Sequence, residues 1–116
     1  MKLQIRTKEG LKEFEAELNM ITYDIYYETF RRDFHVDTVN DFTVNGACGR
    51  AYLQRVMYAM IKTVDIEFMD FYSFLLSLED NISNFLDNID KDLIDLINSK
   101  ITNSPSKELA DDKITN

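Results

Sequence analysis

The residue types that most often do chemistry in proteins are scarce in this chain. It holds one cysteine, Cys48, and one histidine, His35. Nucleophilic catalysis needs an activating base beside the nucleophile, and neither residue lies in a recognised catalytic motif. Cys48 is most simply a small residue near a helix start, and His35 a surface residue near a helix end. The sequence therefore predicts a protein that is not an enzyme and binds no cofactor.

One acidic run, Asp87-Asn-Ile-Asp-Lys-Asp92, has part of the spacing of a calcium-binding loop. Such a loop also needs a glycine for its sharp turn and a closing glutamate, and the run has neither. Because apolar residues keep a helical period through it, we expect a solvated helix face and no metal. Gly46 and Gly49 form no phosphate-binding loop, because no Lys-Ser or Lys-Thr pair follows at the required spacing.

The overall charge of −8, from 21 acidic and 13 basic residues, limits the kinds of partner that this chain can bind. Nucleic-acid binding is built from Lys and Arg that neutralise phosphates, so we expect no nucleic acid and no anionic membrane as partner. No segment approaches the ~20 apolar residues of a membrane span. A single cysteine excludes an intramolecular disulfide and is compatible with a reducing cytoplasm.

Residues 2–18 carry two runs that alternate between apolar and charged positions. Leu3 and Ile5 alternate with Lys2 and Arg6, and after Gly10 a second run alternates with glutamates. Two such runs joined by a short loop with glycine predict a β-hairpin, with the basic face of one strand beside the glutamates of the other. A helix with a stripe of Leu11, Phe14, Leu18 and Ile21 is the competing interpretation, and we prefer the hairpin because glycine is a poor residue for a first helical turn.

Helical periodicity takes over from Thr22 onward. It predicts helices at about 22–35, 47–63, 70–79 and 83–100, with Thr22 and Asp70 as N-caps. The first stripe is formed by Tyr23, Tyr27, Phe30 and Phe34, and His35 and Asp37 mark the end of that helix. The expected fold is mainly α (α+β): a hairpin on a bundle of about four helices, in a single compact domain at 1–101. Pro105 and the polar residues around it predict a flexible, disordered tail over 102–116.

One short segment is apolar on nearly every side. Its members are Phe68, Met69, Phe71, Tyr72 and Phe74. A small domain has little interior to spare for so many large side chains, so some of them are expected to face a partner or another subunit. If they face another subunit, the protein is a homo-oligomer. Packing of all five side chains in the core remains the alternative.

The order of these elements resembles the tail assembly chaperones of long-tailed phages and prophages of Gram-positive bacteria. The hairpin LQIRTKEGLKEFEAEL is followed by ITYDIYYETFRRDF, similar to the family's aromatic helix that closes on a Phe-Arg/Gly-Arg/Lys-Asp-Phe/Leu ending. YLQRVMYAMIKTVD, MDFYSFLLSLED and DLIDLINSKITNSPSK resemble its later helices and polar tail, so that the likeness covers most of residues 2–107. The connection VDTVNDFTVNGACG is longer and more polar than the family's pattern.

This resemblance implies a helper protein used while the tail tube is built. Such proteins coat the long helical tape-measure protein, keep it soluble, recruit the major tail (tube) protein and are absent from the mature virion. A −1 ribosomal frameshift near the end of the gene often extends a fraction of the molecules. The location implied is the cytoplasm of the bacterial host.

A rival hypothesis is a small phage-encoded inhibitor or anti-defence protein that blocks an enzyme by surface mimicry. It would need a dense acidic face, for which Asp87, Asp90, Asp92 and Asp95 are the candidates. A helical regulatory or immunity protein that binds another protein is a third hypothesis.

Overall fold

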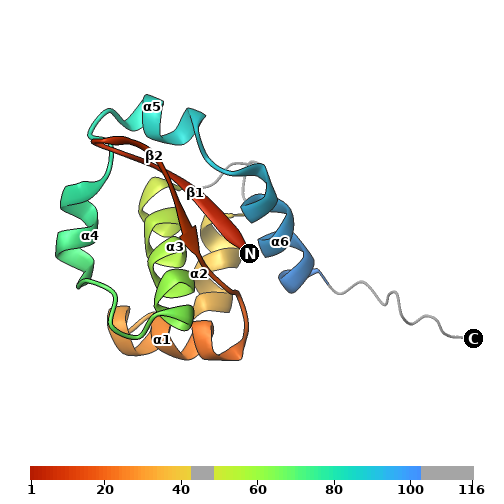
Figure 1. Cartoon of the computed structure of the whole chain (residues 1–116). Helices are drawn as coiled ribbons and strands as arrows, with labels where there is room; N and C mark the ends of the chain where they lie inside the picture. The colour runs from red at the N-terminus through yellow and green to blue at the C-terminus, as the bar shows by residue number, and fades with distance from the viewer. Residues whose placement is uncertain (43–48, 103–116) are drawn as a thin grey trace, which may run out of the picture.

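The computed structural model describes residues 1–42 and 49–102, in which two strands precede six helices (Figure 1). The strands are β1 (Lys2–Thr7) and β2 (Gly10–Glu15), and the helices are α1 (Met20–Phe30), α2 (Phe34–Asp41), α3 (Arg50–Val64), α4 (Phe71–Ser77), α5 (Ile82–Asp87) and α6 (Lys91–Ile101). The predicted class, an N-terminal hairpin on a mainly helical domain, is confirmed. Cys48 and residues 103–116 of the predicted tail lie outside the described residues.

The hairpin has the register that the alternation predicts. Lys2 pairs with Glu15 and Leu3 with Phe14, so Leu3 and Ile5 point inward and are buried. On the outer face the Lys2 ammonium lies 2.6 Å from the Glu15 carboxylate, the expected cross-strand charge pair. Gly10 closes the turn with a φ of 110°, a conformation that disfavours any side chain.

The helix predicted at 22–35 is two helices. Arg31 adopts the left-handed conformation, with a φ of 55°, and ends α1. Asp33 then accepts a hydrogen bond from the N–H of Val36 and begins α2. The predicted continuous stripe from Tyr23 to Phe34 is therefore wrong, and His35 and Asp37 lie inside α2 rather than at a helix end.

The start of α1 and its buried face also differ from the prediction. Asn19, not Thr22, is the N-cap, and Thr22 completes a capping box with it. Tyr26 is completely buried, whereas Tyr27 is 49% exposed. The buried face is set by α3, against which α1 packs, and that contact is not visible in the period of α1 alone.

The helix predicted at 83–100 is also broken. α5 ends at Asp87, and Asp90 accepts a hydrogen bond from the N–H of Asp92 to begin α6. The acidic run is thus the turn between two helices, which corrects the expected continuous solvated face. The apolar period persists across the break because Phe85, Leu93 and Ile97 all reach the same core.

The core is organised around α3, which lies at the centre of the molecule with the hairpin across it (Figure 1). Most of α3 is buried, including both Met57 and Met60. Of the other predicted helices, 47–63 is observed as Arg50–Val64 and 70–79 as Phe71–Ser77, with Asp70 as the predicted N-cap. Within residues 1–42 and 49–102, no helix has the length and apolar character to cross a membrane.

Candidate partner-binding surface

The helix α4 is attached to α3 by a cluster of aromatic rings. The ring of Tyr58 on α3 lies 5.2 Å from that of Phe71 and 5.6 Å from that of Phe74, measured between centroids. Phe68 packs edge-on against Phe74 at 5.8 Å and against Phe14 of β2 at 5.9 Å. Aromatic contacts of this kind stabilise beyond the area they bury, so this side of α4 belongs to the core.

Hydrogen bonds hold α4 at both ends. Before the helix, the hydroxyl of Tyr58 donates to the carbonyl oxygen of Met69 at 2.7 Å. At the end of the helix, the N–H of Lys8 donates to the carbonyl oxygen of Ser77 at 3.0 Å. Just after it, the N–H of Glu79 donates to the carbonyl oxygen of Arg6 at 3.2 Å. A helix of seven residues would not be stable alone, and these contacts fix its position and orientation.

The five residues predicted to bind a partner divide into two groups. Phe74 is 1% exposed and therefore lies in the core, and Phe68 and Phe71 are half-buried against it. Met69 and Tyr72 point outward, with exposures of 42% and 72%. The expectation that some of this segment faces away from the core thus applies to two side chains.

A third exposed residue, Leu76, belongs with them and was missed by the sequence reasoning. It is 53% exposed and follows Tyr72 by four positions, as Tyr72 follows Met69 by three. Residues four positions apart share one helix face, so Tyr72 and Leu76 lie on one face of α4, and Met69 lies just before the helix. The spacing of 72 and 76 is the signal that would have found Leu76. We call Met69, Tyr72 and Leu76 the α4 stripe.

Beside the α4 stripe lies a groove between α4 and the inward face of β2. It encloses about 320 Å³ and is lined by Thr7, Lys8, Glu9, Lys12, Phe14, Met69, Leu76 and Ser77. Its apolar floor comes from Phe14 of the hairpin and from two members of the stripe. We call it the α4–β2 groove. It shares Met69 and Leu76 with the α4 stripe, and the hairpin turn and Ser77 supply its polar walls.

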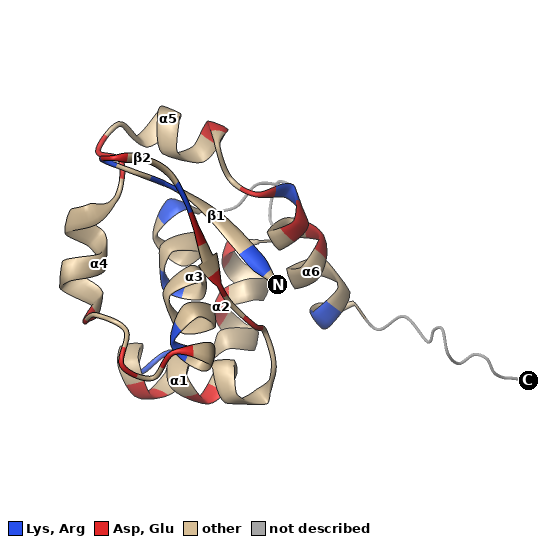
Figure 2. Ribbon diagram, in the orientation of Figure 1, with Lys and Arg blue, Asp and Glu red and all other residues tan. Residues whose placement is uncertain are grey.

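The charged residues of this surface come from the hairpin turn, where Lys8, Glu9 and Lys12 line one side of the groove, and none comes from α4. The helix has no charged residue and is tan along its whole length in Figure 2. At the hairpin turn Lys12 lies 2.7 Å from Glu9, and Lys8 lies 3.7 Å from Asp80. An apolar centre inside a charged rim is the usual composition of a protein-binding surface.

A buried charge network, which the sequence reasoning also missed, joins α1, α2 and α3. The carboxylate of Asp37 is 4% exposed and accepts hydrogen bonds from Tyr26 at 2.5 Å, Arg32 at 2.7 Å and Arg55 at 3.2 Å. Burial raises the pKa of Asp37, but the hydrogen bonds and the two guanidinium charges outweigh burial and lower it overall. Asp37 is therefore ionised at neutral pH, and its role is to hold three helices together.

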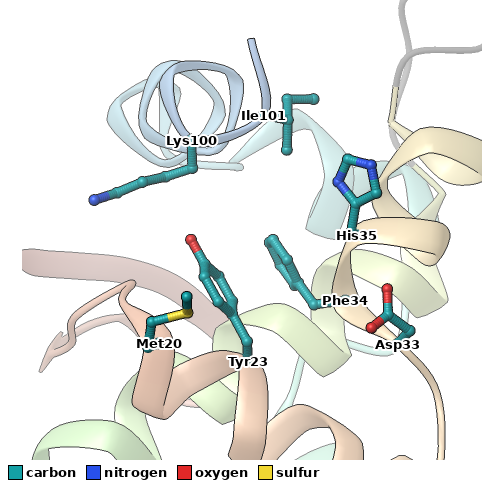
Figure 3. Close-up of a pocket in the computed structure, with 7 residues that line it drawn as sticks. All are labelled: Met20, Tyr23, Asp33, Phe34, His35, Lys100 and Ile101. Carbon is teal, nitrogen blue, oxygen red and sulfur yellow. The ribbon is translucent and has the colours of Figure 1, made fainter. Parts of the chain in front are cut away.

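A second pocket, of about 290 Å³, lies between α1, α2 and the end of α6 (Figure 3). The rings of Tyr23 and Phe34 stack with centroids 4.7 Å apart and point toward Lys100 and Ile101. His35 stands at its edge, and the residues that line the pocket include no serine or cysteine for it to activate.

The acidic residues form no site for a metal in the part of the chain that the structure describes, where no group of three or more His, Cys, Asp or Glu side chains converges. Asp90 is occupied as the cap of α6 and also accepts a hydrogen bond from the N–H of Gln4 at 3.3 Å. Asp87, Asp92 and Asp95 are exposed on α5 and α6.

Comparison with known proteins adds no relative: no protein-family model, no curated protein and no solved structure matches this chain.

Proposed function

We propose that this protein is a tail assembly chaperone of a long-tailed phage or prophage, which binds apolar segments of the tape-measure protein on the α4 stripe and in the α4–β2 groove. The observation that carries the proposal is the α4 stripe itself. Tyr72 is 72% exposed on a helix that is anchored at both ends, so the helix is held in place while its apolar face stays open.

Physical chemistry supports this choice of surface. An amphipathic helical partner lays its apolar face into a groove, and the α4 stripe offers exposed apolar side chains beside one. Met69 adds a flexible side chain that fits different partner residues, which suits one chaperone that binds many sites along one long protein. Weak contacts repeated along that partner gain affinity through multivalency.

The proposed setting follows from the resemblance in the order of elements. The protein would act in the cytoplasm of the bacterial host, recruit the major tail (tube) protein to the coated tape measure, and be absent from the mature virion. The proposed activity is binding alone, without a reaction or a cofactor.

Co-expression with a tape-measure fragment tests the proposal. We expect the wild-type chain to keep the fragment soluble and to elute with it as a complex. The double variant Tyr72→Ser/Leu76→Ser should lose the fragment. The control Met20→Ser/Ile21→Ser, which removes two apolar side chains of slightly greater exposure from α1, should retain it. An insoluble fragment and no complex with the wild-type chain would show that the proposed mechanism is wrong.

The gene offers an independent test. We expect a heptanucleotide slippery site near codons 100–116 and, immediately downstream, a very long reading frame that encodes a coiled coil. Absence of both would remove the support that the resemblance gives to the proposal.

A further inference from the structure

The two edges of the hairpin differ in their hydrogen bonding. Along the outer edge of β1, the N–H of Gln4 donates to Asp90, the carbonyl oxygen of Arg6 accepts from Glu79, and the N–H of Lys8 donates to Ser77. This edge is thus covered by the segment after α4 and by the turn before α6.

The outer edge of β2 is open. Met1 and Ala16 exchange two backbone hydrogen bonds, at 2.8 and 2.9 Å, which fixes the alternation along the ladder. Together with the register, this places the backbone N–H and C=O groups of Leu11, Glu13 and Glu15 on the side away from β1. Within residues 1–42 and 49–102 these groups have no hydrogen-bond partner, and all three side chains are exposed.

A strand added at this edge would meet two different environments. Its residues opposite Glu13 and Glu15 would lie on the outer face, beside two exposed carboxylates, of which that of Glu15 also pairs with Lys2 of β1. Its intervening residues would point to the inward face, where the α4–β2 groove offers Phe14, Met69 and Leu76 beside Lys12, whose ammonium pairs with Glu9. The carboxylates at the edge of β2 and the apolar floor of the groove together define the sequence of a complementary strand.

We propose that the open edge of β2 binds an extended partner segment in which basic residues alternate with apolar ones. The segment pairs with the backbone of β2, sets its basic side chains beside Glu13 and Glu15, and places its apolar side chains in the α4–β2 groove. This inference rests on the proposed function and specifies the conformation in which part of the partner is held at that surface. Strand addition of this kind takes its affinity from backbone hydrogen bonds and its specificity from alternate side chains.

Charge argues against a second copy of this chain as the occupant. Three symmetric antiparallel registers of two β2 strands pair more than one of the free N–H groups. The register centred on Glu13 sets Glu13 opposite itself, the one centred on Phe14 sets Glu13 opposite Glu15, and the one centred on Lys12 sets Lys12 opposite itself. Like charges directly opposite one another destabilise a strand pair, so self-pairing is disfavoured in each of these three registers.

Peptide binding to the full-length protein tests the proposal. The probes are capped peptides of about six residues, the ordinary length of a strand. One alternates Lys with Val, a second alternates Glu with Val, and a third has the Lys and Val residues grouped in two blocks. We expect the alternating Lys-Val peptide to bind at least about tenfold more tightly than either of the others.

A proline substitution tests the backbone contact. Proline at position 13 removes an N–H that points away from β1, so the ladder within the hairpin stays intact. Glu13→Thr removes the same carboxylate but keeps the N–H, which makes it the matched control. We expect Glu13→Pro to bind the Lys-Val peptide about tenfold more weakly than Glu13→Thr.

Should Glu13→Pro fail to fold by circular dichroism, the wild-type protein is titrated instead with a Lys-Val peptide N-methylated along one edge. We expect that modification to weaken binding by the same factor. Equal binding of the proline and threonine variants, or of the methylated and unmethylated peptides, would overturn the inference. A dimer in sedimentation that Glu13→Pro dissociates would also overturn it, in favour of a second copy.

The two proposals fail in different ways. If Tyr72→Ser/Leu76→Ser loses the tape-measure fragment while Glu13→Pro retains it, the strand inference is wrong and the chaperone proposal stands. If the Lys-Val peptide binds as expected but the wild-type chain captures no fragment, the open edge of β2 is a binding site and the chaperone proposal is wrong.

Discussion

The hydroxyl of Tyr26 on α1 donates a hydrogen bond to the carboxylate of Asp37 on α2 at 2.5 Å, and Arg55 of α3 contacts both side chains. The contact joins two helices that the sequence had suggested were one. Arg32, in the turn between the two helices, also donates a hydrogen bond to this carboxylate at 2.7 Å and so ties the turn to the network.

The Asp37→Asn variant should unfold more easily at neutral pH, because Arg32 and Arg55 would lose the charge that compensates them. Removing one partner of a buried ion pair costs about 3 kcal/mol, which is the expected loss in the free energy of unfolding at pH 7. Urea denaturation followed by circular dichroism measures it. The exposed Asp24→Asn is the matched control and should change little.

The difference in stability between wild type and Asp37→Asn should depend on pH. Because the pKa of Asp37 is lower in the folded than in the unfolded protein, its stabilising contribution is complete above about pH 4 and is lost as the pH falls through the folded pKa. The difference between wild type and Asp37→Asn should therefore shrink as the pH is lowered from about 4. A difference that stays constant down to strongly acidic pH would contradict the assigned role.

Truncation to alanine should affect stability very differently at two positions of α4, one buried and one exposed. Phe74 is 1% exposed, so Phe74→Ala should lower the free energy of unfolding by about 3–5 kcal/mol. Tyr72 is 72% exposed, so Tyr72→Ala should stay within about 0.5 kcal/mol of wild type. Thermal and urea denaturation measure both, and a large loss for Tyr72→Ala would mean that the α4 stripe is part of the core.

The capping box at the start of α1 should be measurable in the same way. Asn19 accepts hydrogen bonds from the N–H groups of Ile21 and Thr22, at 2.9 and 3.4 Å. Asn19→Ala removes both acceptors and should cost about 1 kcal/mol. Asn98→Ala, at an exposed position within α6, provides the control and should cost nothing, because alanine favours a helix interior. Equal stability of the two variants would argue against the cap.

The hairpin turn depends on the backbone of Gly10. Its φ is 110°, and no atom lies within 4 Å of the position that a Cβ would take. Gly10→Ala should therefore destabilise the protein through backbone conformation alone, by about 1 kcal/mol, as judged by its denaturation midpoint. Glu9→Ala at the adjacent turn residue should leave the midpoint nearly unchanged, because its ion pair with Lys12 is exposed.

Local patterns were enough to predict the hairpin, the central helix and the cap of α4. Alternation in residues 2–18 and the glycine between the two runs determine the hairpin, because strand faces repeat every two residues. The breaks at Arg31–Asp33 and Asn88–Asp90 were missed because the apolar period runs through both. There, Arg31 or Asn88 ends one helix and an aspartate N-cap begins the next, and neither break contains proline or glycine.

The candidate surface was predicted only in part, for a reason of tertiary structure. Composition identified the segment that contains it, but which side faces outward depends on Tyr58, ten or more residues earlier in the chain. The same holds for Asp37, whose partners at positions 26, 32 and 55 come together only once three helices have packed.

The bond between Gln4 and Asp90 has a consequence for the order of folding during synthesis. These residues are 86 positions apart, and the carboxylate of Asp90 serves both the first strand and the last helix. The hairpin is synthesised before these partners, so its β1 edge is covered in two steps, first by Ser77 and Glu79 and then by Asp90. Until Ser77 and Glu79 have been synthesised, both edges of the hairpin present backbone groups that can pair with other chains.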